Sequence, residues 1–382
     1  MSQEPIARPH MDPLFQRMVE LKGSDMYLTV GCPASVRVDQ RIIAVGDAPL
    51  SDEDLTQMVS EMLDEDKLNE FHSTMEFNLP MQWRETMRFR INVFRQQQHM
   101  GAVIRRIETT IPTAESLDLP KIYNDLILEN RGLVLVVGAT GSGKTSSLAA
   151  MAGYRNRVGY GHILTVEDPI EYIHQHGTCI ITQRDIGVDT YSFGMALKNA
   201  LRQRPDVVII GEIRDRETME HALHFSETGH LCVATLHAGN TTQAIERVLN
   251  FFPEEKHQQT LYSLSNNLRA ILSQRLVMDL QNKRKVAVEV MLNRGFIRTL
   301  IQENKLKEIP EIMAKNRNEG MQTFDQALLQ LFTDGHISEE VAGAESDNPA
   351  NIRLNIRQHQ SGARKPAQPQ SIPLKSNIPG AF

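Results

Sequence analysis

GLVLVVGATGSGKT, at residues 132–145, reads as a buried strand, a glycine-rich turn and the start of a helix. Its last eight residues match the P-loop pattern, and a strand before the loop with a helix after it is the context that this motif requires. In such a loop the backbone N–H groups surround phosphate oxygens, and the helix N-terminus adds partial positive charge. We therefore predict that Lys144 reaches the β- and γ-phosphates of ATP and that Thr145 binds Mg²⁺. The residues predicted to contact the nucleotide are Gly138, Ala139, Thr140, Gly141, Ser142, Gly143, Lys144, Thr145 and Ser146.

Around this motif, short apolar runs alternate with segments of helical length, which predicts an α/β domain with a parallel sheet and crossover helices. Each predicted strand ends in a glycine loop or a polar residue. Ligands bind beyond the carboxyl ends of parallel strands, so these strand ends are expected to form one site. The predicted strands are 132–138, 162–168, 206–212 and 231–237, and the predicted helices are 144–157, 192–203, 216–228 and 242–250.

The strand at 206–212 has an acid at each end, and its length decides which acid belongs to the site. Six steps of ~3.3 Å separate the two acids by roughly 20 Å, so only Glu212 can lie near the P-loop. We predict that Glu212 is the general base that activates the attacking water. The alternative is a surface carboxylate that pairs with Arg214. Asp206 is predicted to have a structural role.

The same reasoning separates His230 from His237 by about 23 Å, and only His237 lies at the carboxyl end of its strand. We predict that His237 senses the γ-phosphate and that His230 is structural. Glu167 ends the second strand, where a carboxylate can hold Mg²⁺ directly or through water, and it is the predicted metal ligand. Asp168 and Glu171 are weaker candidates for the same role.

The rest of the chain divides by composition. Residues 1–108 mix helical and alternating apolar patterns, which predicts an α+β domain with helices at 12–22 and 51–71 and strands within 26–45 and 88–95. Residues 109–120 contain two prolines and are predicted to be a linker. The ATPase domain is predicted to span 121–356 and to end in a helical part that includes amphipathic helices at 261–276 and 323–332. Residues 357–382, rich in Gln, Pro and Ser, are predicted to form a disordered tail.

Bulk composition excludes several classes of protein. Of the 382 residues 41% are apolar and 23% are charged, which is typical of a globular protein. The net charge of -6 gives no general attraction to nucleic acid, so no nucleic-acid partner is predicted. No apolar run approaches the ~20 residues that cross a bilayer, and the first residues lack the apolar core of a signal peptide. We therefore predict a cytoplasmic protein.

Four segments together resemble the secretion and pilus ATPases. They are residues 138–145, 163–172 (ILTVEDPIEY), 201–215 (LRQRPDVVIIGEIRD) and 228–237 (TGHLCVATLH), which correspond to the P-loop, aspartate box, atypical Walker B and histidine box of that family. The resemblance implies a RecA-like ATPase domain with a helical C-terminal part. It also implies that residues 11–107 form a PAS-like N-terminal domain.

Within this family Gly320-Met321-Gln322-Thr323 resembles the pilus retraction branch, the PilT/PilU group. Two departures from the PilT pattern favour the PilU side. FIRTLIQE at residues 296–303 stands where PilT-type chains have AIRNLIRE, and Arg204 replaces the acid usual before Pro-Asp. These departures predict an accessory motor that works with a PilT-type partner.

The resemblance further implies a homohexameric ring at the inner face of the cytoplasmic membrane that hydrolyses ATP with Mg²⁺ and acts on an inner-membrane platform protein. By motif position, Arg90 and Arg105 are the arginines that such enzymes bring from the N-terminal domain onto the nucleotide. Without the resemblance they read as a solvated basic face. The open alternatives for the whole chain are an extension or secretion ATPase, a scaffold that binds nucleotide without hydrolysing it, and a RecA-like DNA translocase.

Overall fold

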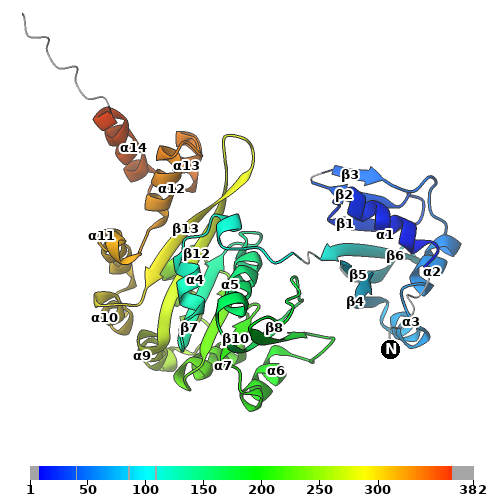
Figure 1. Cartoon of the computed structure of the whole chain (residues 1–382), viewed down its shortest axis with the longest axis horizontal. Helices are drawn as coiled ribbons and strands as arrows, with labels where there is room; N and C mark the ends of the chain where they lie inside the picture. The colour runs from blue at the N-terminus through cyan, green and yellow to red at the C-terminus, as the bar shows by residue number, and fades with distance from the viewer. Residues whose placement is uncertain (1–7, 40, 85–86, 108–109, 364–382) are drawn as a thin grey trace, which may run out of the picture.

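Two β-sheets organise the chain (Figure 1). The computed structural model describes residues 8–39, 41–84, 87–107 and 110–363. The first sheet has six antiparallel strands in the order β3-β2-β1-β6-β5-β4, and the second has seven strands in the order β13-β12-β7-β11-β10-β8-β9. None of the helices in these described ranges is long and apolar enough to span a bilayer.

Three helices, α1 to α3, accompany the first sheet. The helix predicted at 51–71 proves to be two helices, α2 and α3. Ser51 caps α2 with a capping box, but Asp64 accepts a hydrogen bond from the Lys67 N–H and starts α3, so the predicted helix 51–71 is wrong as a single element. The elements are α1 (Met11–Glu20), β1 (Asp25–Thr29), β2 (Ser35–Val38), β3 (Arg41–Ala44), α2 (Asp52–Ser60), α3 (Glu65–Thr74), β4 (Glu76–Trp83), β5 (Met87–Gln96) and β6 (His99–Ile107).

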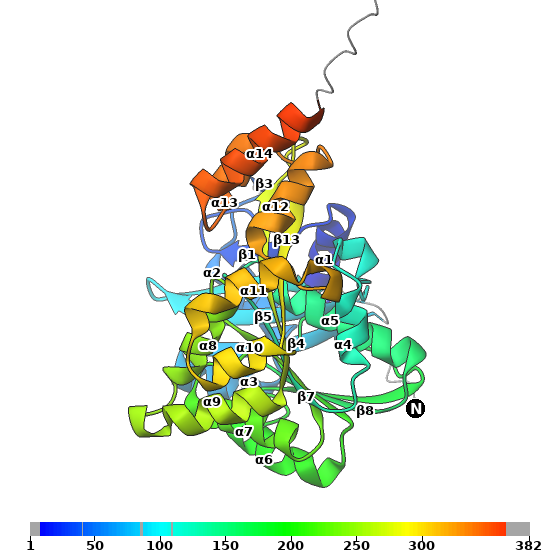
Figure 2. The same cartoon turned by 90° about the vertical axis from the view of Figure 1, so that its left-hand side faces the viewer.

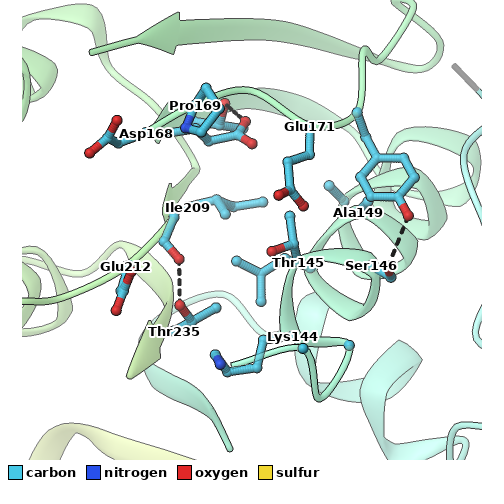
Figure 3. Close-up of a pocket in the computed structure, with 18 of the residues that line it drawn as sticks. Lys144, Thr145, Ser146, Ala149, Asp168, Pro169, Glu171, Ile209, Glu212 and Thr235 are labelled. Atoms are coloured by element: carbon cyan, nitrogen blue, oxygen red, sulfur yellow. Dashed lines mark hydrogen bonds between the residues drawn. The ribbon is translucent and has the colours of Figure 1, made fainter. Parts of the chain in front are cut away.

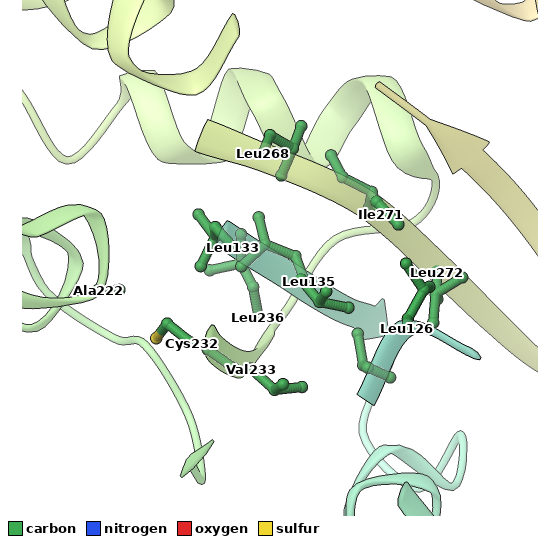
Figure 4. Close-up of a cluster of buried hydrophobic side chains, with 14 of the residues drawn as sticks. Leu126, Leu133, Leu135, Ala222, Cys232, Val233, Leu236, Leu268, Ile271 and Leu272 are labelled. Atoms are coloured by element: carbon green, nitrogen blue, oxygen red, sulfur yellow. The ribbon is translucent and has the colours of Figure 1, made fainter. Parts of the chain in front are cut away.

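The second sheet contains the four predicted strands at its centre, with crossover helices on both faces. β7 is buried along its whole length because it lies between β12 and β11, and its side chains pack with Cys232, Val233 and Leu272 (Figure 4). The strands are β7 (Gly132–Gly138), β8 (Gly161–Glu167), β9 (Cys179–Asp185), β10 (Val207–Ile210), β11 (Leu231–Leu236), β12 (Leu268–Met278) and β13 (Arg284–Leu292).

The helices of this second part include the four predicted to follow the central strands, α5 to α8, and one that was not predicted, α4. They are α4 (Ile122–Ile127), α5 (Lys144–Val158), α6 (Phe193–Ala200), α7 (Arg216–Glu227), α8 (Thr241–Leu249), α9 (His257–Asn267), α10 (Phe296–Gln302), α11 (Ile309–Lys315), α12 (Phe324–Thr333), α13 (Glu339–Glu345) and α14 (Pro349–Ala363). Short 3-10 turns lie at Glu115–Leu117, Leu201–Gln203, Glu254–Lys256, Leu306–Glu308 and Arg317–Glu319.

The predicted helix at 261–276 is wrong. Helix α9 ends at Asn267 and the chain continues as β12, which pairs in parallel with β7 and antiparallel with β13. The run from Leu268 to Leu272 is apolar enough for either a buried helix or a buried strand, and sheet pairing decides between them. The sheet is therefore parallel except at its β13 edge. The two edge strands, β9 and β13, were not predicted either.

The predicted tail needs a correction too, because α14 continues to Ala363 and residues 357–363 are helical. Ile352 and Ile356 lie one turn apart on α14 and are fully buried beside Phe324 and Leu328 of α12. This packing anchors the helix. No proline, which would interrupt a helix, follows Pro349 until Pro366. The rest of the predicted tail, 364–382, lies outside the described residues. We call α12, α13 and α14 the C-terminal bundle. Its helix α12 packs against β13, and its helix α13 packs against β12 (Figure 2).

Candidate nucleotide-binding site

A cavity of about 490 Å³ lies at the carboxyl ends of the central strands (Figure 3). The P-loop, the loop after β8 and the ends of β10 and β11 all contribute side chains to it. This is the edge at which a parallel sheet binds ligands. The structure therefore brings four separate segments of the sequence into one site.

The P-loop has the backbone shape that a phosphate cradle needs. Gly143 has φ +90°, and a Cβ at Gly138 would lie 2.4 Å from the Ser142 hydroxyl oxygen, so neither position tolerates a side chain without strain. The Ser142 hydroxyl is buried and has no partner within the described part of the chain. Lys144 Nζ donates to the carbonyl oxygens of Gly138 (3.0 Å) and Ala139 (2.8 Å). Burial also lowers the pKa of Lys144 from its ordinary value.

Not every predicted P-loop residue faces this cavity. Those that line it are Thr140, Gly141, Gly143, Lys144, Thr145 and Ser146. Ala139 and Ser142 instead line a neighbouring cavity of about 500 Å³, where the outer side of the loop faces Arg275, Arg284 and Glu345. The P-loop thus lies between the nucleotide cavity and this second cavity, which residues of β12, β13 and α13 line on the other side.

The end of β8 and the loop after it supply the acids that suit a hard cation. Glu167 accepts hydrogen bonds from Thr165 Oγ1 (2.6 Å) and Gln183 Nε2 (3.2 Å), and desolvation in the pocket raises the pKa of Glu167 to about 7. Glu171 lines the cavity and points toward Thr145 in Figure 3. Mg²⁺ typically takes one or two carboxylates and completes its shell with water and phosphate oxygens. Thr145 with Glu167 or Glu171 therefore fits Mg²⁺, so Glu171 is a stronger candidate here than its sequence position indicated.

Glu212 is held on both oxygens. Its Oε1 lies 2.7 Å from His237 Nε2, and its Oε2 lies 2.8 Å from the Arg214 guanidinium. Arg214 reaches on to Asp168 Oδ2 at 3.1 Å, and Asp168 lines the same cavity. Two readings of Glu212 were predicted as alternatives: a general base at the site, and a carboxylate paired with Arg214. In the structure Glu212 both lines the cavity and pairs with Arg214. Glu212, Arg214 and His237 all line the cavity.

Asp206 and His230 lie at the opposite end of their strands, outside the cavity. Asp206 accepts a hydrogen bond of 2.7 Å from the His162 N–H, and its backbone N–H donates to the His162 carbonyl at 2.8 Å. His230 contacts Thr228 and packs edge-on against Phe225. Both residues thus have structural partners in the loops where their strands begin.

Arg90 and Arg105 do not line the nucleotide cavity. They are direct neighbours on β5 and β6, and they line a separate cavity of about 180 Å³ together with Glu171 and Tyr172 of the loop after β8. Arg105 Nε also donates to Asp25 Oδ1 at 2.8 Å. In this arrangement the loop that carries Glu171 stands between the two arginines and the P-loop. Their predicted contact with a γ-phosphate would require this loop and the first sheet to move.

If Arg90 and Arg105 act on the γ-phosphate after such a movement, Arg90→Ala and Arg105→Ala should lower ATP turnover by about 10³-fold or more, as loss of an arginine finger does. ADP affinity should change far less, because ADP has no γ-phosphate. Steady-state turnover and ADP titration of both variants measure this. Arg95→Ala, which removes another β5 arginine from an exposed position, is the matched control. Full turnover in both test variants would make the arginines surface charges.

Sequence reasoning missed two positioning groups. Gln183 lies on the unrecognised strand β9, donates to Glu167 and to the Tyr172 carbonyl (2.9 Å), and accepts from the His174 N–H (2.8 Å). The β-branched run before it, at 180–182, was the available signal for this strand. The second positioning group that was missed is Tyr172. Its hydroxyl lies 2.9 Å from Ser146 Oγ and joins the loop after β8 to the P-loop helix α5.

Comparison with known proteins places this geometry in a family. The family described as Type II/IV secretion system protein matches residues 53–360. The chain is 50% identical to the type IV pilus ATPase PilU of Pseudomonas aeruginosa over 345 residues, which is 90% of each chain. It is 37% identical over 330 residues to the retraction ATPase PilT of the same organism, covering 86% of this chain and 96% of PilT.

Solved structures agree with the sequence relatives. The crystal structure of the pilus retraction motor PilT with bound ADP matches with a TM-score of 0.84 at 37% identity, over 89% of this chain and 98% of that one. The match extends across both sheets, so the α/β fold with an antiparallel N-terminal sheet and an ATPase domain is confirmed. The chain belongs to the type II/IV secretion system protein family, and within it to the group of type IV pilus ATPases that contains PilU and PilT.

Proposed function

We propose that this chain is an ATP-hydrolysing motor subunit that drives or assists the retraction of type IV pili. One observation carries the proposal: a single cavity contains a P-loop lysine and threonine, three acids from the end of β8 and the loop after it, and the Glu212–His237 pair. Binding alone would need the P-loop but not a carboxylate held beside a histidine at the far side of the cavity. Kinship with PilU and PilT favours retraction over an extension or secretion role.

The residues divide the reaction between them. Lys144 exchanges its two carbonyl partners for phosphate oxygens when ATP enters, because a charged oxygen is the stronger acceptor. Thr145 with Glu167 or Glu171 would hold Mg²⁺, which would supply positive charge beside the β- and γ-phosphates. His237 donates to the γ-phosphate and in doing so leaves Glu212 Oε1 free to orient and deprotonate water. Arg214 keeps the other oxygen of Glu212 fixed throughout.

We further propose that six copies assemble into a ring at the cytoplasmic face of the inner membrane. A PilT-type ATPase and an inner-membrane platform protein are the proposed partners, and nucleic acid is not. Membership of the PilU/PilT group supports these assignments. The domain division at residues 1–108 and 121–356 belongs to the same proposal. The described residues form one apolar core on each sheet and a third cluster between the second sheet and the C-terminal bundle. The separation of the first sheet's core supports the division, although Ala114 and Leu119 of the intervening segment pack into the second core.

Lys144→Ala tests the proposed function. Removing the one buried cation of the loop should weaken ATP binding by roughly 10- to 100-fold, the cost of losing hydrogen bonds from a charged group. Titration with a fluorescent ATP analogue and a phosphate-release assay on the full chain measure affinity and turnover. Lys198→Ala, a lysine at the end of α6 outside the cavity, is the matched control. Tight ATP binding by the unaltered chain without phosphate release would instead make it a nucleotide-binding scaffold.

A further inference from the structure

The loop that follows His237 is fastened to the C-terminal bundle. After β11 ends at Leu236, residues 237–240 connect to α8, whose first residue is Thr241. The Gly239 carbonyl accepts a hydrogen bond from the Arg275 guanidinium at 3.1 Å, and the Thr241 N–H donates to Glu289 Oε1 at 2.7 Å. The side chains of Arg275 and Glu289 therefore hold the second half of this short loop and the start of α8.

Arg275, on β12, connects the loop with three parts of the C-terminal bundle. Its guanidinium donates to the Glu345 carbonyl at 2.5 Å and pairs with Asp347 at 2.6 Å. The same group lies 3.9 Å from the ring centre of Phe324, the first residue of α12. The planar guanidinium can make several directed hydrogen bonds and stack at once, which a lysine ammonium cannot. Displacement of α12 or α13 therefore strains the contact of Arg275 with Gly239.

Glu289, on β13, makes a second and parallel connection. One carboxylate oxygen accepts from Thr241 at the start of α8, and the other accepts from the N–H of Phe324 at the start of α12 (3.4 Å). The side chain is 4% exposed, so water does not compete well for these bonds. β13 itself pairs with the segment before α12 through reciprocal hydrogen bonds of Val290 and Gln322. The start of α12 is thus rigidly joined to the start of α8.

We propose that Arg275 and Glu289 are positioning residues that couple the C-terminal bundle to His237, and through it to Glu212. His237 is separated from Gly239 by one residue and lies 2.7 Å from Glu212, so a shift of the loop moves the histidine against the base. A partner that displaces the C-terminal bundle would then alter hydrolysis without touching the nucleotide. This proposal rests on the proposed ATPase function and adds a route by which the site is regulated.

The experiment is a double-mutant cycle on the full chain with Mg²⁺ and ATP. Arg275→Ala should lower kcat by roughly 3- to 30-fold, the range found for residues that act through coupling, and leave KM for ATP nearly unchanged. In the background of His237→Ala the same substitution should change kcat by less than about twofold, because its route of action is already broken. Arg275→Lys should recover only part of the loss, since it keeps the charge and lacks the fork.

The control is Arg317→Ala, which removes an arginine contact of 3.1 Å to Gln330 of α12 without touching the loop after His237. It should leave kcat unchanged in both backgrounds. An equal fall in kcat for Arg275→Ala with and without His237 would overturn the proposal, because the residue would then act on the domain as a whole. Wild-type turnover in His237→Ala would also overturn it while leaving the ATPase function intact.

Hydrogen exchange supplies a readout independent of activity. Arg275→Ala and Glu289→Gln should each raise exchange at residues 239–249 and at residues 324–333 together, whereas Arg317→Ala should not raise exchange at 239–249. Glu289→Gln preserves the size of the side chain, so it remains usable if Arg275→Ala folds poorly. Unchanged exchange at 239–249 in both variants would refute the connection even if the chain proved to hydrolyse no ATP.

Discussion

Glu212→Gln should bind ATP normally and turn it over about 10²- to 10⁴-fold more slowly, the usual contribution of a general base. Glutamine has the same shape and can keep a contact with Arg214 and His237, but its amide cannot accept the proton of the attacking water. The expected loss corresponds to roughly 3 to 5.5 kcal/mol in the activation free energy. Single-turnover phosphate release with saturating ATP separates this chemical step from binding.

Asp206→Asn is the matched control for Glu212→Gln, because it also replaces a carboxylate by an amide but at the opposite end of the same strand. Asp206 accepts the His162 N–H at 2.7 Å, 44 residues away in sequence, and takes no part in the cavity. Its replacement should lower the thermal midpoint and leave turnover per folded molecule close to normal. A Glu212→Gln protein with near-normal turnover would remove Glu212 from the role of base, whatever the control does.

The centre of the fold was accessible from the sequence because it depends on local signals. β7 and β11 are fully buried runs of mostly apolar residues that end at a glycine loop or a histidine, and the P-loop fixes where the helix after β7 begins. Strand rise then selected Glu212 over Asp206 and His237 over His230. The structure places the selected residues at the cavity and the others at the far edge.

The errors share a physical cause, which is that the deciding contacts are distant in sequence. β12 is a strand because β7, more than a hundred residues earlier, offers an edge for it, whereas its own apolar run also suits a helix. α14 extends beyond residue 356 because Ile352 and Ile356 find an apolar surface on α12. Arg214 pairs with both Glu212 and Asp168 because β8 and β10 are neighbours in the sheet. No local sequence pattern reveals this pairing of strands.

The surface of α10 bears on whether this motor works alone. The three positions at which its sequence departs from the PilT-type pattern, Phe296, Thr299 and Gln302, are all exposed, and Phe296 is 53% exposed. Ile297, Leu300 and Ile301, which match that pattern, are buried. The departures therefore fall on the exposed face of α10, and they leave its buried face unaltered.

These three changes add an aromatic ring and remove one positive charge relative to the PilT-type face. Changes of volume and charge at an interface commonly cost ~1–3 kcal/mol, which lowers affinity by roughly tenfold to a hundredfold. A platform protein suited to the PilT-type face would then bind this chain too weakly to receive force from it. We expect that a partner ring carrying that face transmits the force, while hydrolysis in this chain contributes to the stroke.

Retraction in a pilus-bearing cell should therefore depend on the presence of the PilT-type partner but not on its hydrolysis. With this chain intact, cells whose partner has an inactive P-loop should retract pili, and cells without the partner should not. Lys144→Ala in this chain should abolish retraction beside the inactive partner, because no ring would then hydrolyse ATP. A chain with Phe296→Ala, Thr299→Asn and Gln302→Arg together restores the PilT-type face, and it should regain some retraction without the partner. Retraction by the unaltered chain in cells that lack the partner altogether would show that the present α10 surface already engages the platform, and this chain would then be a primary motor.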